Sequence, residues 1–340
     1  MNEIFNDKLY LAEYDLDSSL FEKFNIEPYD LYPLRSIFVV NTDKGMKILK
    51  KIQYNEKELL FIYKALNYIR SKFDKVMSFT HTYDKKIYTN WENNMYCMID
   101  LVDGRESDYN NPIDIKIASK GLSKLHSASI GFKTDLNHRN YSGKLLDNFK
   151  ESIEEMKVFK NIASLHKNKD EFDSIFLDNI DYYIDEIKKS INILEDSSYY
   201  ELCNENGKIA ICHHDLAHHN IIINDEKEEA YFIDFDYSIV DLRVHDMCNF
   251  ISKATKNFAY DIEKAKLILD EYNSENSLDK REIEVLYGML TFPQDFYSIS
   301  RDYYTKRKGW EEDIFVDKIK KKTECEEFRI AFLDKFEELI

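Results

Sequence analysis

The chain has 340 residues, a net charge of −17 and a hydrophobic content of 44%, with 14% aromatic residues. This length and apolar content suffice for one large two-lobed unit or for two domains with their own cores. The strong negative charge argues against a nucleic-acid or acidic-membrane partner, so we expect neither.

Five cysteines stand singly along the chain, and no Cys-x-x-Cys pair occurs. An odd number of scattered cysteines favours a reducing compartment over a disulfide framework or a zinc ribbon. The first residues lack a basic stretch followed by an apolar one, and no apolar run approaches the ~18 residues that cross a bilayer. We therefore expect cytoplasmic synthesis and no membrane partner.

The first hundred residues predict a small antiparallel sheet with one prominent helix. In chain order we expect a helix over residues 9–28, strands over 36–42 and 46–52 with a tight turn at 43–45, a helix over 55–71, and strands over 86–89 and 94–102. This order of elements is typical of the nucleotide-binding lobe of a kinase-type fold. We therefore assign residues 1–103 to such a lobe.

After Asp103-Gly104-Arg105 the composition shifts to helices. We expect helices over residues 113–127, 145–163, 172–194, 242–268, 279–304 and 313–339, with a pair of strands between the third and fourth. Residues 104–340 are therefore predicted to form a larger, mostly helical catalytic and substrate lobe. The predicted fold is α+β and two-lobed, with the hinge near residues 103 and 104 and a nucleotide in the cleft beside it.

The most informative segment runs from Ile211 to Ile223, and its end is an apolar strand. It contains the pattern His-x-Asp-x₄-Asn, formed by His213, Asp215 and Asn220, and Asp234 follows 19 residues after Asp215. Phosphoryl transfer uses one carboxylate to orient or deprotonate the acceptor hydroxyl, while an amide oxygen and a second carboxylate hold Mg²⁺. We therefore predict Asp215 as the catalytic residue and Asn220 and Asp234 as Mg²⁺ ligands.

The same loop allows a second interpretation, a transition-metal site. Four histidines within seven residues suit zinc or nickel, namely His213, His214, His218 and His219. No cysteine pair has ligand spacing, however, and such a site would leave Asp215, Asn220 and Asp234 without a role. A buried structural turn is the remaining alternative, and kinase-like chemistry is the interpretation that we favour.

These motifs resemble the aminoglycoside phosphotransferase and choline kinase superfamily, whose second motif is often Asp-Phe-Asp, as at residues 234–236 here. Further stretches are similar to the CotS-type spore coat protein family: residues 41–45, 58–62, 102–106, 108–112, 245–246 and 292–310. The resemblance covers nearly the full length. It implies a kinase-like fold, ATP and Mg²⁺ as cofactors, location in the spore coat and contacts with other coat proteins. Membership alone does not establish an activity.

The resemblance also implies a nucleotide site in the first lobe. Only one of Lys50 and Lys51 can point inward on a strand, and the family match favours Lys50 as the partner of the nucleotide phosphates. Its expected acidic partner on the next helix is Glu58, with Glu56 as the alternative. Residues 98–102, including Ile99 and Leu101, are expected to face the adenine through backbone groups.

The sequence departs from an ATP kinase at the phosphate loop, because no glycine occurs before Gly45. The turn before the first hairpin strand is expected at residues 32–36, where Arg35 is the available phosphate-binding group. Two hypotheses follow. The chain is a phosphotransferase acting on a hydroxyl of an unidentified small molecule or coat component, or it is an inactive pseudokinase that serves as a coat scaffold. An acidic cleft around Asp236 and Asp241 would favour a cationic or polyhydroxylated acceptor.

Overall fold

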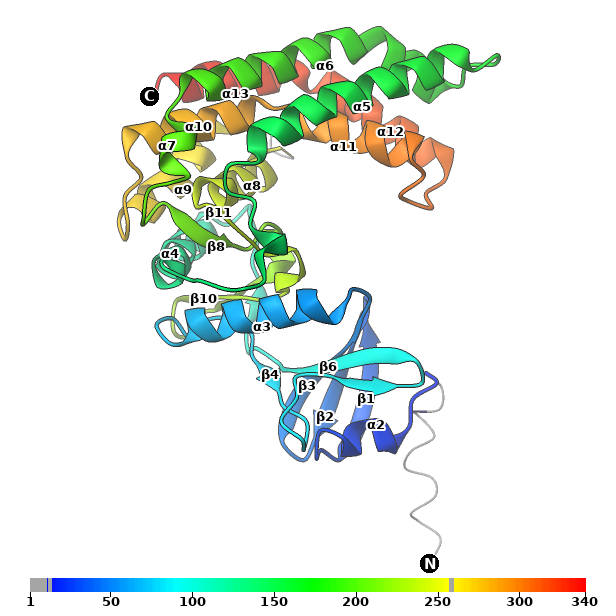
Figure 1. Ribbon diagram of the computed structural model, residues 1–340, viewed down its shortest axis with the longest axis vertical. Coiled ribbons are helices and arrows are strands. Elements are labelled where there is room, and N and C mark those ends of the chain that lie inside the picture. Colours follow the sequence, from blue (N-terminus) through cyan, green and yellow to red (C-terminus); the bar gives the residue numbers. More distant parts are fainter. Residues whose placement is uncertain (1–10, 12–13, 257–259) are drawn as a thin grey trace, which may run out of the picture. The chain divides into compact units, whose positions relative to one another are not determined.

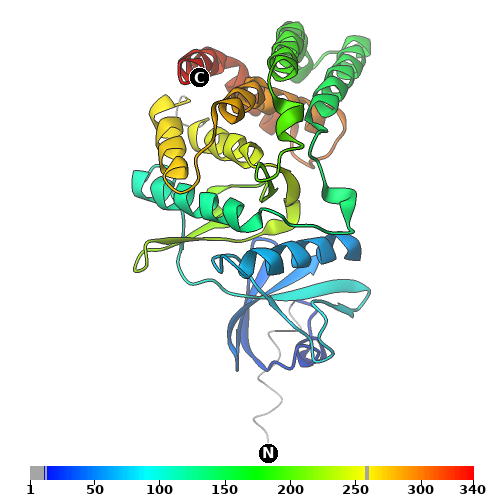
Figure 2. The same ribbon diagram turned by 60° about the vertical axis from the view of Figure 1, so that its left-hand side comes forward.

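The computed structural model describes residue 11 and residues 14–256 and 260–340, which form two compact units (Figures 1 and 2). The first unit contains the described residues up to Ser107 together with Phe132–His138 and His218–Tyr237. The second contains Asp108–Gly131, Arg139–Ala217 and Ser238–Ile340. No helix in the described part of the chain combines the length and the apolar character that a bilayer crossing requires.

A six-stranded antiparallel sheet forms the body of the first unit. Its strands are β1 (Pro28–Leu34), β2 (Ile37–Thr42), β3 (Gly45–Ile52), β4 (Phe79–Thr80), β5 (Thr89–Trp91) and β6 (Asn94–Asp100). They lie in the order β1-β2-β3-β6-β4, with β5 paired to β6. The predicted first hairpin is confirmed as β2 and β3, and Gly45 takes a φ of +87° at the turn, a conformation that glycine adopts without steric cost. The strand predicted over residues 86–89 begins only at Thr89.

The helix predicted over residues 9–28 is confirmed for residues 18–22 and wrong for 14–17 and 23–28, and residues 9, 10, 12 and 13 lie outside the described residues. Helix α2 (Ser18–Glu22) starts at Asp17, whose side chain accepts a hydrogen bond from the Ser19 amide at 2.6 Å. The chain then enters β1. This strand is hard to recognise in the sequence because it contains two prolines, Pro28 and Pro33. They are tolerated because β1 lies at the sheet edge, where a missing N–H breaks no ladder.

The first unit also contains helix α3 (Glu56–Arg70), which runs beside the sheet in both views (Figures 1 and 2). The Asn55 side chain caps it by accepting from the Glu58 amide at 3.1 Å. Three short strands form a second sheet in the order β10-β9-β7. They are β7 (Arg105–Glu106), β9 (Ile221–Asn224) and β10 (Glu229–Phe232), which belong to the same unit as the main sheet. Asn220 directly precedes β9, and Asp234 follows β10 after one residue.

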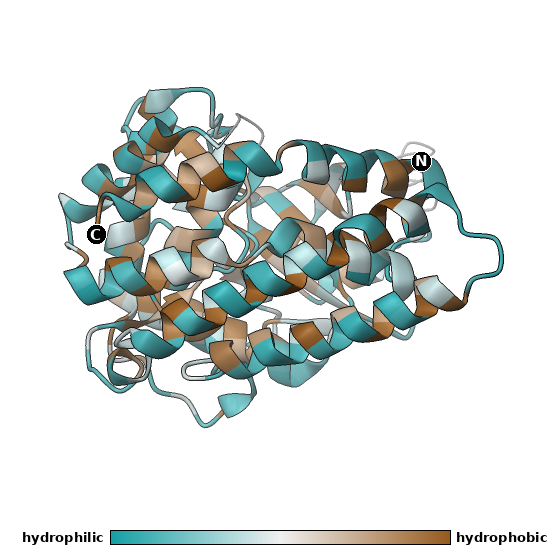
Figure 3. Ribbon diagram, turned by 90° about the horizontal axis from the view of Figure 1, so that it is seen from above, coloured by the Kyte–Doolittle hydropathy of each residue, from teal (hydrophilic) through white to brown (hydrophobic). Residues whose placement is uncertain are grey.

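The second unit is mostly helical around a two-stranded sheet, in which β8 (Ile209–Cys212) pairs with β11 (Ile239–Leu242). Its helices are α4 (Pro112–Ser129), α5 (Leu145–Leu165), α6 (Glu171–Asp196), α7 (Tyr199–Leu202), α8 (Val244–Thr255), α9 (Ile262–Asn273), α10 (Lys280–Thr291), α11 (Gln294–Tyr304), α12 (Glu312–Glu324) and α13 (Glu326–Glu337). Apolar residues form stripes along these helices (Figure 3), as expected where one face of each helix is buried against its neighbours.

The predicted helices over 113–127, 145–163 and 172–194 are confirmed as α4, α5 and α6. The three later ones are each divided. The segment 279–304 breaks at Pro293 into α10 and α11 because proline lacks the amide hydrogen that a continuing helix needs. The segment 242–268 contains the end of β11, then α8 and the start of α9, with residues 257–259 outside the described residues.

Candidate active site

The strand lysine and the second motif meet in the first unit. Lys50 lies on β3, and its Nζ atom is 2.7 Å from Asp234 Oδ1 and 2.7 Å from Asp236 Oδ2. Its side chain is 15% exposed, whereas Lys51 is exposed, so Lys50 is the inward member of the pair, as predicted. Because residues far apart in sequence converge here, the fold places a cation on the carboxylates of the Asp-Phe-Asp motif.

The charges of this cluster reinforce one another. Burial disfavours the charged form of Lys50, but the carboxylates of Asp236 and Asp234 outweigh that effect and raise the pKa of Lys50 above its ordinary value. Asp236 also accepts a hydrogen bond from the Tyr54 hydroxyl at 2.9 Å. Asp234 adopts a φ of +62°, which is uncommon for a residue other than glycine. Such a strained conformation is typical of a functional turn.

The two predicted Mg²⁺ ligands lie next to each other in the first unit. The Ile233 amide donates to the backbone carbonyl of Asn220 at 3.0 Å, which joins the start of β9 to the residue before Asp234. Asn220 is 2% exposed. An amide oxygen and carboxylate oxygens form the hard donor set that Mg²⁺ prefers, so these residues fit the ion chemically.

The candidate catalytic loop in the second unit is held by Asp246 of α8. One carboxylate oxygen accepts the His213 amide at 2.6 Å, and the other accepts the His214 amide at 2.8 Å. His126 Nε2 lies 3.0 Å from the same carboxylate. Burial raises the pKa of Asp246, but these hydrogen bonds and the histidines outweigh it and lower that pKa to about 2. Asp246 therefore stays ionised and fixes the loop that carries Asp215.

Two further residues of α8 contact the same loop, and the sequence interpretation missed both. The Asn249 side chain accepts from the Leu216 amide at 2.8 Å. Lys253 Nζ pairs with Asp215 Oδ1. The available signal was their spacing, because Asp246, Asn249 and Lys253 are separated by three and four residues and share one helix face.

The histidine-rich loop does not gather its four histidines into a metal site among the described residues. The group there whose ligand atoms could share an ion is His126, Cys212 and Asp246, all buried. The hydrogen bonds of these three side chains explain their clustering better than a metal ion does. The Cys212 thiol donates to the Leu242 carbonyl at 3.4 Å, and burial raises the pKa of that thiol well above its ordinary value. His126 and Asp246 are bonded to each other, so these three side chains are accounted for by contacts within the protein.

His214 occupies an unusual position next to Asp215. Its φ is +65°, and its ring lies edge-on to the ring of His245, with the centroids 4.6 Å apart. Burial and the neighbouring His245 lower the pKa of His214 to about 4, so its ring is neutral at neutral pH. His245 Nδ1 is 2.9 Å from the Asp241 carboxylate.

Asp241 does not line an acidic acceptor cleft in the way that we expected. It is 3% exposed, and its carboxylate is bonded to His245 and to the Leu242 amide. Asp236 likewise contacts Lys50 and Tyr54. The acidic residues that favoured a cationic acceptor in the sequence are thus engaged within the protein.

The predicted adenine-facing residues lie on or next to β6. Ile99 is 6% exposed and is paired with Ile48 of β3 and Phe79 of β4. The Leu101 amide donates to the Met46 carbonyl at 3.3 Å. The backbone of this segment is therefore part of the sheet's hydrogen bonding, and its role toward a nucleotide stays a prediction.

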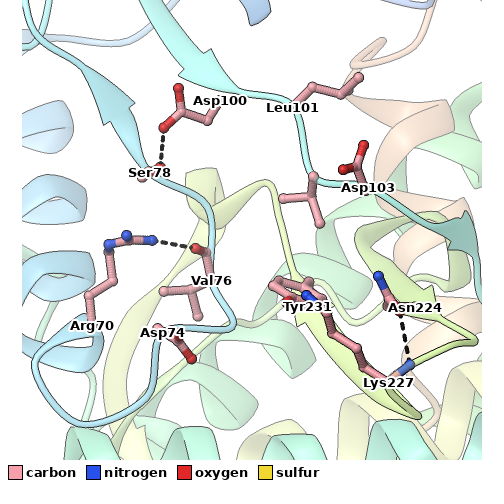
Figure 4. A pocket seen from close by; sticks show the side chains of 11 residues that line it. Arg70, Asp74, Val76, Ser78, Asp100, Leu101, Asp103, Asn224, Lys227 and Tyr231 are labelled. Atoms are coloured by element: carbon pink, nitrogen blue, oxygen red, sulfur yellow. Dashed lines mark hydrogen bonds between the residues drawn. The ribbon is translucent and has the colours of Figure 1, made fainter. Parts of the chain in front are cut away.

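A separate cavity of about 220 Å³ lies in the first unit at the end of β6 (Figure 4). Its lining combines cations, carboxylates and one aromatic ring: Arg70, Asp74, Val76, Ser78, Asp100, Leu101, Val102, Asp103, Asn224, Lys227 and Tyr231. The Ser78 hydroxyl donates to Asp100 at 2.6 Å and Arg70 donates to the Val76 carbonyl at 2.9 Å. Lys50, Asn220 and Asp234 are not among the lining residues, whereas Leu101, one of the predicted adenine-facing residues, is among them. The cavity therefore adjoins the segment predicted to face the adenine and lies apart from the Lys50 cluster.

The remaining predicted residues lie near the N-terminal end of α3 and at the first turn. Glu58 lies in the first turn of α3 and is half-buried, and its pairing with Lys50 stays a prediction. The turn expected over residues 32–36 consists only of Arg35 and Ser36, because β1 extends to Leu34. Arg35 takes a φ of +54° and pairs with Glu106 at 2.9 Å.

The whole chain is similar to solved phosphotransferases. An aminoglycoside phosphotransferase from Alicyclobacillus acidocaldarius matches with a TM-score of 0.82 at 18% identity, covering 95% of this chain and 96% of that one. The spectinomycin phosphotransferase APH(9)-Ia, solved with ADP and spectinomycin, matches with a TM-score of 0.67 at 14% identity, covering 93% and 96%. At these identities the likeness establishes the fold, and the expected two-lobed, kinase-like α+β class is confirmed.

The sequence also matches the family described as "Spore coat putative kinase YutH" over residues 17–336, and the chain belongs to this family. Spore coat protein S of Bacillus subtilis (strain 168) is 26% identical over 312 residues, which cover 90% of this chain and 88% of that protein. The predicted membership of a spore coat family within the kinase-like superfamily is therefore confirmed.

Proposed function

We propose that this spore coat kinase-like protein transfers the γ-phosphoryl group of ATP to a hydroxyl group of an unidentified acceptor. The observation that carries the proposal is the contact of Lys50 with both Asp234 and Asp236 at 2.7 Å. Kinases use a strand lysine to bind the nucleotide phosphates and the first aspartate of the second motif to hold the metal, and this contact brings the two corresponding residues together.

In this proposal Lys50 binds the α and β phosphates, and Asn220 and Asp234 hold Mg²⁺. The ion supplies neutralisation of the phosphate charge when bound. Asp215 orients the acceptor hydroxyl and accepts its proton. Asp246 and Asn249 position Asp215 indirectly, because they bind the amides of the residues on both sides of it.

The proposal is tested by calorimetry of ATP binding with and without Mg²⁺. We expect the wild-type protein to bind ATP only with Mg²⁺, and Asp234→Asn to weaken this binding at least about tenfold through loss of a charged ligand. Asp225→Asn is the matched control, because Asp225 is an exposed aspartate of the same unit that pairs with Arg105. Folded wild-type protein that does not bind millimolar ATP would refute the proposal.

The turn between β1 and β2 favours a second candidate function, a pseudokinase scaffold of the spore coat. Arg35 and Ser36 stand where an ATP kinase presents small residues, and the Arg35 side chain is engaged with Glu106. The family membership supports a location in the spore coat for either candidate. The test uses Asp234→Asn, which should be deficient in Mg²⁺-ATP binding, as a fluorescent fusion in sporulating cells. Whether this protein assembles into the coat separates a scaffold role from a role that needs the nucleotide.

A further inference from the structure

A lysine of α8 lies on the candidate catalytic carboxylate. Lys253 Nζ pairs with Asp215 Oδ1, and the two side chains are 24% and 29% exposed. Asp246 and Asn249, on the same face of the helix, hold the loop through its amides, so the loop and Lys253 are fixed to one rigid element. The ion pair between Lys253 and Asp215 is therefore held in place by helix α8 of the second unit.

Among the described residues, Asp215 is the carboxylate that pairs with Lys253, whereas Asp246 and Asp241 beside this loop have other partners. Asp246 is engaged by His126 and two amides, and Asp241 by His245 and the Leu242 amide. His214, a titratable neighbour of Asp215 in the same loop, is neutral at neutral pH. A group that approaches Asp215 from solvent within this unit thus meets one carboxylate and one ammonium together.

We propose that Lys253 sets the charge class of the acceptor, a hydroxyl compound that carries a carboxylate or phosphate group close to the reacting hydroxyl. This inference rests on the proposed function. The hydroxyl binds Asp215 while the anionic group binds the Lys253 ammonium. An acceptor with an ammonium at that position is repelled by Lys253 at close range. The structure therefore assigns an acceptor class opposite in charge to the cationic acceptor that the expected acidic cleft around Asp236 and Asp241 would have favoured.

The transfer itself balances without a further reactant. The acceptor oxygen forms the new bond to the γ-phosphorus, and the bond between that phosphorus and the bridging oxygen breaks. ADP leaves with the electron pair, and the hydroxyl proton passes to Asp215. Lys253 is a specificity-determining residue in this step, since it binds the acceptor's anionic group and takes no proton.

Three acceptors that share a three-carbon skeleton with hydroxyls on two adjacent carbons test the charge class: glycerate, glycerol and 3-amino-1,2-propanediol, in which the third carbon is a carboxylate, a hydroxymethyl group and an aminomethyl group. Binding of each is measured by calorimetry with Mg²⁺ and a non-hydrolysable ATP analogue, and ADP formation with ATP. For the wild-type protein we expect glycerate to be favoured over 3-amino-1,2-propanediol by at least roughly tenfold. Lys253→Met should abolish this preference, and Lys253→Glu should reverse it.

Lys256→Met is the matched control. It removes the same charge at the C-terminal cap of the same helix, where Lys256 pairs with Asp295 at 3.4 Å, and it should leave the acceptor order unchanged. Thermal unfolding of each variant verifies the fold, and Lys253→Arg should retain the wild-type order. An unchanged order in Lys253→Glu, or no response to any acceptor by protein that binds the nucleotide, overturns the acceptor assignment alone. Wild-type protein that binds no nucleotide overturns the proposed function and this inference together.

Discussion

Replacement of Asp246 by alanine is the change that most directly tests how the candidate catalytic loop is held. The carboxylate is fully buried and accepts the amides of His213 and His214, while His126 lies 3.0 Å away. Removal of the carboxylate leaves both amides and the His126 ring without their acceptor. Loss of one partner from a buried, hydrogen-bonded charged group costs about 3–5 kcal/mol.

The pKa of Asp246 gives a second, independent value for the contribution of its carboxylate to stability. Folding lowers it from 3.8 to about 2, which corresponds to about 2.5 kcal/mol at about 1.4 kcal/mol for each pH unit. Because the folded-state pKa is the lower one, this stabilisation is fully present above pH ~4 and is lost as the pH falls toward ~2. Asp246→Asn should remove this part of the acid dependence, because an amide does not ionise.

Urea unfolding at neutral pH and at several acidic pH values measures both effects. Asp246→Ala should lower the free energy of unfolding by about 3–5 kcal/mol. The control Asp225→Ala, which breaks an exposed pair with Arg105, should lower it by at most about 1 kcal/mol. A loss in Asp246→Ala no larger than that of the control would refute the argument that Asp246 anchors the loop.

Two further changes test the fold around the site. Gly104→Ala should destabilise the protein by about 1–3 kcal/mol in urea unfolding. The added Cβ atom would lie 2.5 Å from the Ile223 carbonyl oxygen, and Gly104 has a φ of +144°, which alanine rarely adopts. The control Gly309→Ala, whose Cβ atom would have no other atom within 4 Å, should leave the stability unchanged. Glu282→Ala should cost about 3–5 kcal/mol in the same assay, since Glu282 is 1% exposed and binds Arg243 at 2.7 Å and Lys208 at 2.8 Å. A Gly104→Ala protein as stable as wild type, or a Glu282→Ala protein that loses less than about 1 kcal/mol, would contradict these two arguments.

The kinase-like class could be predicted because its signals are local. The His-x-Asp-x₄-Asn spacing, the Asp-Phe-Asp motif and the strand, turn and strand of the first hairpin each occupy a short segment. Strand β1 was missed because a local signal can also favour the wrong structure. Its two prolines argue against a strand until its place at the sheet edge is known.

The contacts that build the site could not be predicted, because they join distant segments. Lys50 and Asp234 are 184 residues apart, and Asp215 and Lys253 are 38 apart. The sequence did not reveal that Asp246 binds the backbone amides of the candidate catalytic loop. It also suggested an acidic cleft, since counting carboxylates does not reveal that Asp241 is buried against His245.

The candidate groups fall into two separate clusters, and this division makes the proposals separable. Lys50, Asn220 and Asp234 belong to the first unit, whereas Asp215 and the α8 residues that hold it belong to the second. Each cluster is completed by contacts within its own unit. A change at Asp234 should therefore act on nucleotide binding, and a change at Lys253 should act on acceptor choice while nucleotide binding persists. An enzyme requires both responses, whereas a scaffold predicts neither, so the pair of experiments distinguishes the two functions better than a loss of activity in one variant.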